Sequence, residues 1–296
     1  METREYMARR KAEVDVLLER YLPREEGFQK TIFEAMNYSV RAGGKRLRPI
    51  LMWETYRLFG GSGREIEPFM AAIEMIHTSS LIHDDLPCMD NDELRRGKPT
   101  TWVKYGYDMA VLAGDALLIY AVETASKALS VETPDSARIA RAIGLLAEKT
   151  GIYGMIGGQV VDVELTGQPI PGEKLDFIYR LKTGALLEAS MMIGALLGGA
   201  DEEQLNIVEQ IAAEVGLAFQ IQDDILDVTS TAGKLGKPVL SDEKNHKTTY
   251  VTLEGVEAAR RAVEDHSARA LEELSQLPGR NPELEALIRF LIAREN

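Results

Sequence analysis

The distribution of apolar positions along the chain is helical almost throughout. Apolar residues recur every three or four positions, and the strict alternation of a half-buried strand is almost absent. Pro23 stops the first helical pattern, Gly43 follows the second, and Pro49 and Pro68 suit the opening of the third and fourth. We therefore predict helices over about 3–21, 27–41, 49–60, 68–85, 108–129, 135–150, 153–165, 173–197, 202–227, 254–276 and 282–294.

Two stretches between these helices carry a different pattern. Residues 87–105 are highly charged, and residues 228–246 contain Gly, Pro and Lys at intervals, so both are predicted to be loops. No stretch is long or polar enough to link two domains, and no repeat occurs at a fixed period. The length would allow two domains, but the pattern favours one all-α domain over residues 1–296.

Composition and charge narrow the class of protein. Hydrophobic residues make up 45% and charged residues 27%, as in ordinary globular proteins. The net charge of −13 argues against a nucleic-acid partner, because phosphate neutralisation needs a basic face. The single cysteine, Cys88, allows no intrachain disulfide. No stretch approaches the roughly 20 apolar residues of a membrane span, and the N-terminus has no apolar signal-peptide core. We expect a cytoplasmic protein without a membrane span.

Two aspartate motifs follow apolar helical segments. They are DDLPCMD over 84–90 and DDILD over 223–227. Asp223 and Asp227 are four residues apart and share one helix face, where like charges repel. A cation should compensate for this repulsion, and hard oxygen ligands favour Mg²⁺. The alternatives are solvated surface carboxylates, or a calcium loop, for which the regular ligand spacing and central glycine are missing.

Basic side chains gather around the Gly43–Gly44 pair. Glycines let an anion approach the backbone closely, and Lys and Arg supply point charges and bidentate contacts. This combination favours a diphosphate site. The alternative is a helix C-cap whose cations complement the helix dipole. The basic residues are Arg41, Lys45, Arg46 and Arg48.

Other chemistry-bearing residues are open to two interpretations. His77 lies seven residues before Asp84, close to two helical turns, so both side chains should point the same way, unless His77 is a core histidine. Arg95 and Arg96 follow an acidic stretch and could form surface ion pairs. Lys182 lies in an apolar helix and could point outward. No Ser-His-Asp order, zinc spacing, Walker loop or dinucleotide fingerprint is present.

The ordered set of motifs is more specific than any single one. Together they closely resemble the trans-isoprenyl diphosphate synthases, or polyprenyl synthetases, of the bacterial and plant short-chain branch. The resemblance spans roughly residues 40–250 and implies an all-α bundle of the isoprenoid synthase type with a central cavity. The motifs are GGKRLRP at 43–49, DDLPCMD at 84–90 followed by NDELRRGKPT, KTG at 182–184, FQIQDDILD at 219–227, GKP at 236–238 and KTTY at 247–250.

This resemblance implies a reaction and its cofactor. The family condenses isopentenyl diphosphate head-to-tail with an allylic diphosphate, by Mg²⁺-dependent ionisation, condensation and elimination. It also implies a homodimer and three Mg²⁺ ions gripping the allylic diphosphate. The second aspartates, Asp85 and Asp224, would support the metal ligands around them. The metal residues implied in this way are Asp84, Asp85, Asp90, Asp223 and Asp227.

The resemblance also assigns residues to the two substrates. Ionising the allylic C–O bond leaves a carbocation and a polyanion, which metal ions and cationic side chains stabilise in an apolar, closed cavity. Thr183 and Gln220 would place oxygen dipoles beside the cation. Isopentenyl diphosphate would be bound by Gly44, Lys45, Arg48, His77 and Arg96. The allylic diphosphate would be contacted by Arg95, Lys182, Lys237 and Lys247.

Product length depends on what closes the tunnel for the growing chain. The tail should run from Asp84 toward the start of its helix, where one turn of about 5.4 Å matches roughly one isoprene unit. Farnesyl-forming bacterial relatives carry an aromatic residue five positions before this aspartate. Here Ser79 and Ser80 leave the tunnel open, which predicts C20 geranylgeranyl diphosphate. If Met75, Tyr120 or a residue across the dimer forms the floor, the product is C15 farnesyl diphosphate.

Two rival functions share part of these features. A class I terpene cyclase also ionises its substrate at an aspartate-rich helix, but it needs no isopentenyl diphosphate site, against which GGKRLRP and Arg96 argue. A non-catalytic subunit of a heteromeric prenyl synthase should lack one or both aspartate motifs, and this chain has both.

Overall fold

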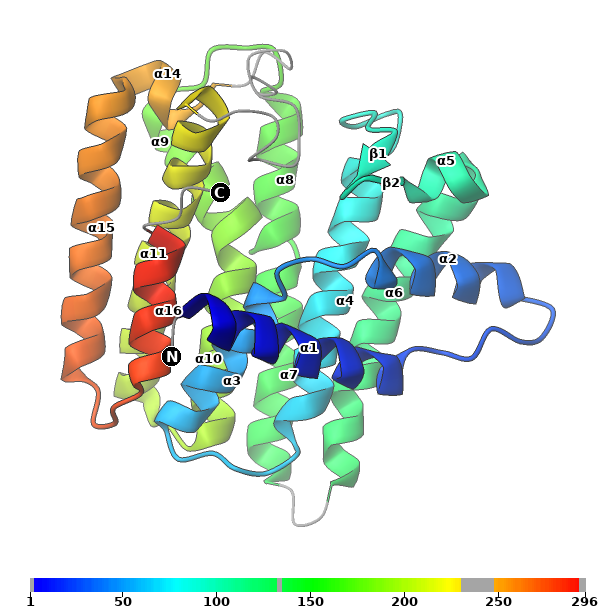
Figure 1. Cartoon of the computed structure of the whole chain (residues 1–296), viewed down its shortest axis with the longest axis horizontal. Coiled ribbons are helices and arrows are strands. Elements are labelled where there is room, and N and C mark those ends of the chain that lie inside the picture. Colours follow the sequence, from blue (N-terminus) through cyan, green and yellow to red (C-terminus); the bar gives the residue numbers. More distant parts are fainter. Residues whose placement is uncertain (1–2, 132–134, 230–247, 293–296) are drawn as a thin grey trace. The chain divides into compact units, whose positions relative to one another are not determined.

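The predicted all-α class is confirmed. The computed structural model describes residues 3–131, 135–229 and 248–292, and helices make up most of this part of the chain (Figure 1). The chain divides into two compact units. Unit 1 comprises Met1–Ile50 and Gly63–Ile143, and unit 2 comprises Leu51–Ser62 and Gly144–Asn296. The division falls within two helices, α3 (Leu47–Leu58) and α7 (Ser136–Thr150).

Unit 1 is built around one core helix, α4. Phe69, Ile73 and Met75 have no exposed surface, and α4 is apolar on nearly every side, as expected of a helix enclosed by others. It packs most extensively against α6, which runs beside it (Figure 1). The other elements of unit 1 surround this pair. They are α1 (Thr3–Tyr21), α2 (Lys30–Arg41), α4 (Ile66–Asp84), β1 (Leu94–Arg95), β2 (Lys98–Pro99), α5 (Thr101–Tyr105), α6 (Tyr107–Ser126) and the 3₁₀ helix η1 (Lys127–Ser130).

Unit 2 has its own core helix, α10. Gly194 and Gly198 lie one turn apart on α10, and added Cβ atoms would come 2.3 Å from the Met52 carbonyl oxygen and 2.7 Å from the Tyr56 carbonyl oxygen of α3. These glycines permit the close crossing of the two helices. Outside them, α11 and α15 run side by side (Figure 1). The elements are α8 (Met155–Glu164), α9 (Gly172–Ile178), the π-helix η2 (Tyr179–Gly184), α10 (Ala185–Gly198), α11 (Glu202–Thr229), α14 (Tyr250–Glu254), α15 (Val256–Gln276) and α16 (Pro282–Ile292).

The structure corrects the prediction of a loop over 87–105. This stretch contains the short antiparallel pair β1–β2 and the helix α5. Arg96 and Gly97 form the turn with φ of +53° and +73°, which is the two-residue hairpin geometry that matches strand twist. The strands have two residues each, which is too short to show a period of two.

Three other predicted elements are also wrong in detail. The single helix expected over 173–197 is interrupted by the π-helix η2. The apolar pattern of η2 resembles that of the α-helices on either side of it, so the sequence does not reveal the interruption. The helix expected over 254–276 begins earlier as α14 and breaks at Gly255, whose φ is +83°. The predicted 228–246 loop begins later, because α11 continues to Thr229, and residues 230–247 lie outside the described part of the chain.

Two described helical segments are long and apolar enough to cross a membrane by length and composition alone. These are Tyr107–Ser130 and Gly172–Gly198. The most apolar window of Gly172–Gly198 is 78% buried, as in the core helix of a globular unit. The corresponding window of Tyr107–Ser130 is 39% buried. Such helices are weak evidence for a membrane span, and its absence stays a prediction.

Candidate active site

The first aspartate motif lies where core helix α4 ends. Pro87 disfavours helical backbone at Leu86, and the chain turns back there. The Asp90 amide donates to the Asp84 carbonyl oxygen at 2.9 Å, and the Met89 amide donates to the Leu86 carbonyl at 2.8 Å. This turn brings Asp90 back to the end of α4. Asp84 is half-buried and Asp90 is exposed.

Asp85 differs from Asp84 and Asp90 because it is buried and bound to Arg95. Arg95 Nε and Nη2 lie 2.7 and 2.5 Å from the Asp85 Oδ1 atom. Burial raises the pKa of Asp85 to about 6, although the Arg95 charge opposes this rise. Asp85 therefore anchors the β1–β2 hairpin to the end of α4. Its implied contact with a metal stays a prediction.

Arg95 and Arg96 are neighbours that reach different places. Arg95 turns toward Asp85, whereas Arg96 at the hairpin turn lays its guanidinium against Gly44. A Cβ atom on Gly44 would lie 2.7 Å from Arg96 Nη2, and the φ of Gly44 is +142°. Both its backbone conformation and this close approach therefore require glycine at position 44.

Arg96 joins Arg48, a second cation that repels it, beside the neutral ring of His77. Burial, reinforced by Arg96, lowers the pKa of Arg48 to about 10. Burial and the charges of Arg48 and Arg96 hold the pKa of His77 well below its usual value. Arg48 Nε is buried without a hydrogen-bond partner in the described residues. We call Gly44, Arg48, His77 and Arg96 the cationic cluster. An anion would relieve its repulsion, so it is a candidate diphosphate site.

Two of the basic residues around Gly43–Gly44 have structural partners instead. Arg46 is buried, with Nε 2.8 Å from Asp15 Oδ1 and Nη1 2.7 Å from Glu74 Oε1. Arg41 forms an ion pair with Glu19 at 2.8 Å on the surface. Their carboxylate partners already compensate these charges. Lys45, on the same loop, is exposed.

In unit 2, the π-helix η2 carries Lys182 and Thr183. Two neighbouring helices approach its backbone at glycines. An added Cβ on Gly158 of α8 would lie 2.3 Å from the Lys182 amide nitrogen, and one on Gly216 of α11 would lie 3.1 Å from the Gly184 Cα. A π-turn interrupts the regular helical register and is frequent at functional sites. These close backbone contacts determine the directions in which the Lys182 and Thr183 side chains leave η2.

Lys182 and Thr183 reach opposite neighbours of η2. Lys182 Nζ donates to Asp162 Oδ2 at 2.5 Å, and Thr183 Oγ1 donates to Gln220 Oε1 at 2.9 Å. All four residues line a cavity of about 170 Å³ within unit 2. A few convergent polar groups against an apolar wall are typical of a small-molecule site. The apolar wall comprises Leu165, Ile170, Leu175 and Ile178.

Asp162 is a site residue that sequence reasoning missed. It follows Gly158 by four residues, so both lie on the α8 face that meets η2. A glycine pair, Gly157–Gly158, inside a predicted helix signals close backbone approach. An acidic residue one turn later on that face could have been read as a partner for Lys182.

The second aspartate motif occupies the end of α11. Asp223 is half-buried, whereas Asp224 and Asp227 are each 2% exposed. No group of three or more His, Cys, Asp or Glu side chains forms a protein-only metal cage in the described residues. Carboxylates in small numbers nevertheless fit Mg²⁺, which usually takes one or two from the protein and completes its shell with water and substrate phosphate.

The remaining predicted residues are placed as follows. Ser79 is buried and donates to the Ile76 carbonyl at 2.7 Å, and Ser80 donates to the His77 carbonyl at 2.9 Å. Both hydroxyls are therefore satisfied within α4. Lys237 and Lys247 lie outside the described residues.

Sequence comparison matches these features to one family. The sequence model described as polyprenyl synthetase matches residues 29–288. This chain belongs to the polyprenyl synthetase family. Its relatives include a farnesyl diphosphate synthase of Geobacillus stearothermophilus, 43% identical over 292 residues that cover 99% of this chain and 98% of that protein. A chloroplastic geranylgeranyl pyrophosphate synthase of Catharanthus roseus is 47% identical over 270 residues, covering 90% and 74%.

A solved structure extends the similarity to the whole fold. A geranyltransferase from Helicobacter pylori, complexed with magnesium and isoprenyl diphosphate, superposes with a TM-score of 0.84 at 33% sequence identity. The match covers 99% of this chain and 97% of the Helicobacter pylori chain. The family resemblance drawn from the sequence motifs is thus confirmed.

The low pKa of His77 makes the stability of the enzyme depend on pH. Folded His77 stays neutral, while the unfolded chain takes up a proton below about pH 6.5, so the free energy of unfolding falls as the pH falls. His77→Gln should remove this loss. Between pH 7 and 5, urea unfolding followed by circular dichroism should show that the free energy of unfolding falls further in wild type than in the variant, by up to about 2 kcal/mol. Parallel pH curves for the two proteins would show that His77 is not held neutral.

Proposed function

We propose that this chain condenses isopentenyl diphosphate head-to-tail with allylic diphosphates to give a short-chain trans-prenyl diphosphate. The cationic cluster carries the proposal, because it offers a diphosphate site in addition to the aspartate motif. Within unit 1, the adjacent residues Arg95 and Arg96 reach the aspartate end of α4 and the cationic cluster, respectively. One hairpin thus contacts residues assigned to two different diphosphates, as a two-substrate reaction requires.

The allylic diphosphate is bound through magnesium and cations. Asp84, Asp85, Asp90, Asp223 and Asp227 are the residues proposed to hold about three Mg²⁺ ions, which neutralise the departing diphosphate when bound. Arg95 and Lys182 add fixed positive charge that needs no reorganisation during ionisation. Lys237 and Lys247, which lie outside the described residues, are proposed to join them on the basis of the family resemblance.

The chain positions the reacting groups and excludes water. The cationic cluster and Lys45 hold isopentenyl diphosphate so that its alkene meets the allylic cation. The side-chain oxygens of Thr183 and Gln220 stabilise that cation, beside an apolar wall that disfavours water. The proton lost in the last step goes to the leaving diphosphate, so the mechanism needs no protein base.

The proposed product is C20 geranylgeranyl diphosphate, with C15 farnesyl diphosphate as the alternative. Ser79 and Ser80 place no bulky side chain in the two positions that precede the motif by about one turn. Relatives named for the two products differ little in identity, at 43% and 47%, so overall identity does not decide the length. Met75, which is fully buried on α4, is the first candidate for a floor that would shorten the product.

Ser79→Tyr tests the tunnel directly. An aromatic ring at this position should block elongation and convert a C20 product largely into C15, because one helical turn spans about one isoprene unit. Chromatography of the dephosphorylated products measures the distribution. Met75→Ala is the matched test of the alternative and should lengthen a C15 product. An unchanged distribution in Ser79→Tyr would remove Ser79 from the tunnel.

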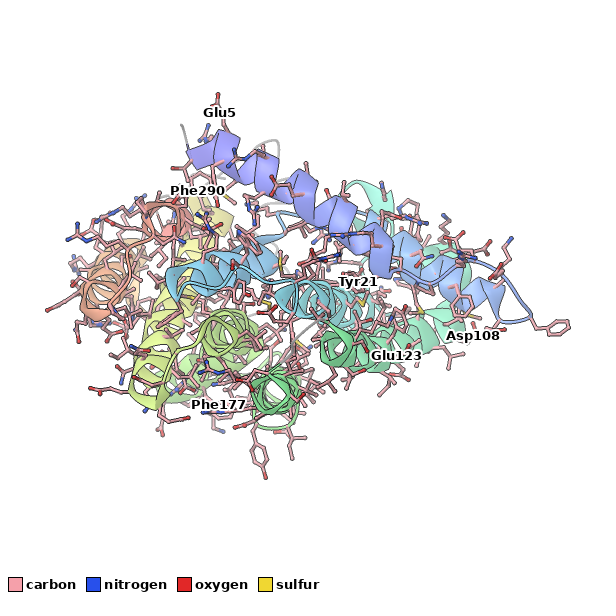
Figure 2. All side chains as sticks on the ribbon, turned by 90° about the horizontal axis from the view of Figure 1, so that it is seen from below. Glu5, Tyr21, Asp108, Glu123, Phe177 and Phe290 are labelled. Carbon is pink, nitrogen blue, oxygen red and sulfur yellow. The ribbon has the colours of Figure 1, made fainter. Side chains whose placement is uncertain are left out.

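We also propose that the enzyme is a cytoplasmic homodimer. In unit 1, α6 exposes a stripe of apolar side chains: Leu112 is 54%, Ile119 70% and Val122 38% exposed. These positions are seven and three residues apart and share one helix face. Asp108 and Glu123 mark the two ends of this helix (Figure 2). A second copy of the chain is the occupant that the family resemblance implies for such a face.

Ile119→Glu should dissociate the dimer. A two-fold interface buries this residue twice, at about 1.5 kcal/mol or more for each copy, so the substitution should remove about 3 kcal/mol in total and weaken dimerisation at least a hundredfold. Sedimentation equilibrium measures the change. Val16→Glu on α1 is the matched control, since Val16 is 66% exposed. A dimer of wild-type strength in Ile119→Glu would exclude this face as the interface.

The purified protein alone decides between the function classes. With Mg²⁺, isopentenyl diphosphate and dimethylallyl, geranyl or farnesyl diphosphate, we expect elongated products, and none in excess EDTA. Cyclic or hydrolysed products without consumption of isopentenyl diphosphate would indicate a terpene cyclase. No turnover with any primer would favour a subunit that needs a catalytic partner.

Gly44→Ala sharpens this test. Its Cβ should displace the Arg96 guanidinium and raise the KM for isopentenyl diphosphate roughly tenfold or more, because a charge-assisted contact is lost. The KM for the allylic diphosphate should change little. An equal rise in the KM values for both substrates would show that the cationic cluster is not a specific site for isopentenyl diphosphate.

A further inference from the structure

Asp224, the second aspartate of its motif, is a buried carboxylate with donors from three places. Its Oδ2 atom accepts from the Tyr179 hydroxyl of η2 at 2.5 Å and from the Tyr250 amide of α14 at 3.0 Å. Its Oδ1 atom accepts from Gln220 Nε2, one turn earlier on α11, at 3.3 Å. Three donors compensate for the cost of burying its charge.

These hydrogen bonds determine which way the Gln220 amide faces. An ionised carboxylate only accepts hydrogen bonds, so the Gln220 NH₂ group must face Asp224 and the amide oxygen must face Thr183. Thr183 must then donate its hydroxyl proton to Gln220. The lone pairs of the Thr183 oxygen therefore face away from Gln220. Both residues line the cavity of about 170 Å³.

We propose that Asp224 is a positioning residue that orients the Gln220 amide. The Thr183 hydroxyl must then donate its proton to the Gln220 oxygen, so that Thr183 presents lone pairs instead of a proton to the allylic cation. A hydroxyl proton aimed at a carbocation would raise its energy, whereas an oxygen dipole lowers it. This inference rests on the proposed function, because it concerns the cation formed in that reaction.

Tyr179 completes the arrangement. Its hydroxyl also accepts from the Tyr250 amide at 3.2 Å, so Tyr179, Asp224 and the first residue of α14 form one hydrogen-bonded group. Tyr250 itself is fixed because Thr249 and Thr252 form a reciprocal capping box at this helix start. Asp224 thus has its carboxylate plane set by two rigid elements, η2 and α14.

The same contacts distinguish Asp224 from its neighbour Asp223. Both oxygens of Asp224 accept from protein donors and the side chain is buried, whereas Asp223 is half-buried. The three protein donors occupy most of the roughly four lone-pair sites of this carboxylate, so a Mg²⁺ ion at about 2.1 Å would have to compete with them. We therefore assign Asp224 to the support of Gln220 and not to the metal.

Steady-state kinetics of Asp224→Asn test this role. Asparagine has the same shape, but its NH₂ group can donate a hydrogen bond. The Gln220 side-chain amide can then flip, so that its oxygen faces position 224. We expect kcat to fall roughly tenfold to a hundredfold, with less than about a threefold change in half-saturating Mg²⁺. Tyr179→Phe should cause a smaller fall of the same kind. If Asp224 bound the metal, Asp224→Asn would instead raise the Mg²⁺ requirement steeply, and excess Mg²⁺ would restore kcat.

The Thr183→Val background separates positioning from general damage. Without the hydroxyl, the Gln220 amide no longer sets the direction of a Thr183 proton, so Asp224→Asn should lower kcat by a smaller factor than in the wild-type background, and the remaining loss measures the contribution of the Gln220 oxygen itself. The same loss in both backgrounds, or wild-type kcat in Asp224→Asn, would overturn the proposal. Glu54→Gln is the matched control, because Glu54 is also a buried carboxylate of unit 2, bound to Asn281.

Crystals of the wild-type protein with Mg²⁺ and inorganic diphosphate provide a readout that needs no turnover. We expect Asp224 to keep Tyr179 and Gln220 within hydrogen-bond distance and to lie outside the metal shell. A metal ion about 2.1 Å from an Asp224 oxygen would overturn the assignment. If wild type forms no prenyl product, the proposed function fails, and this structure still decides whether Asp224 orients Gln220 or binds metal.

Discussion

The ion pair between Asp85 and Arg95 is the interaction on which the described site in unit 1 depends. It joins the end of the core helix α4 to a hairpin whose strands have two residues each and could not hold their place alone. Once Arg95 is fixed, the tight turn leaves Arg96 against Gly44. The cationic cluster draws on the glycine loop, α3, α4 and the hairpin, and the Asp85–Arg95 contact places the hairpin member, Arg96.

The two aspartate motifs use their second residue in the same way. Asp85 and Asp224 are buried and accept from donors on other elements, whereas Asp84 and Asp223 beside them are half-buried. Adjacent residues on a helix point about 100° apart, so a pair can face a substrate and the interior together. In each doubled aspartate, the second residue is thus the one held by protein donors, and the first is the more accessible.

The sequence predicted the helices well because their apolar periodicity is long and regular, as in α4 and α10. It could not predict the hairpin, whose strands are too short for a period, or the π-turn. It also could not rank the cations of GGKRLRP. Arg46 and Arg48 look equivalent there, but Arg46 is compensated by Glu74, which is 28 residues away in the sequence. Asp162 was missed for the same reason, since its partner Lys182 is 20 residues distant.

The π-helix η2 has a consequence for the length of the chain at this point. Its wider turn accommodates one residue more than an α-helical turn would. Removing a single residue between Tyr179 and Gly184 would turn the following helix by about 100° relative to α9. Almost every side of α10 is buried, and its two close-contact glycines fit only one orientation. Insertions and deletions here should therefore damage the fold far more than substitutions at positions of η2 that have no role in the site, so the residue count of this stretch is constrained separately from its residue types.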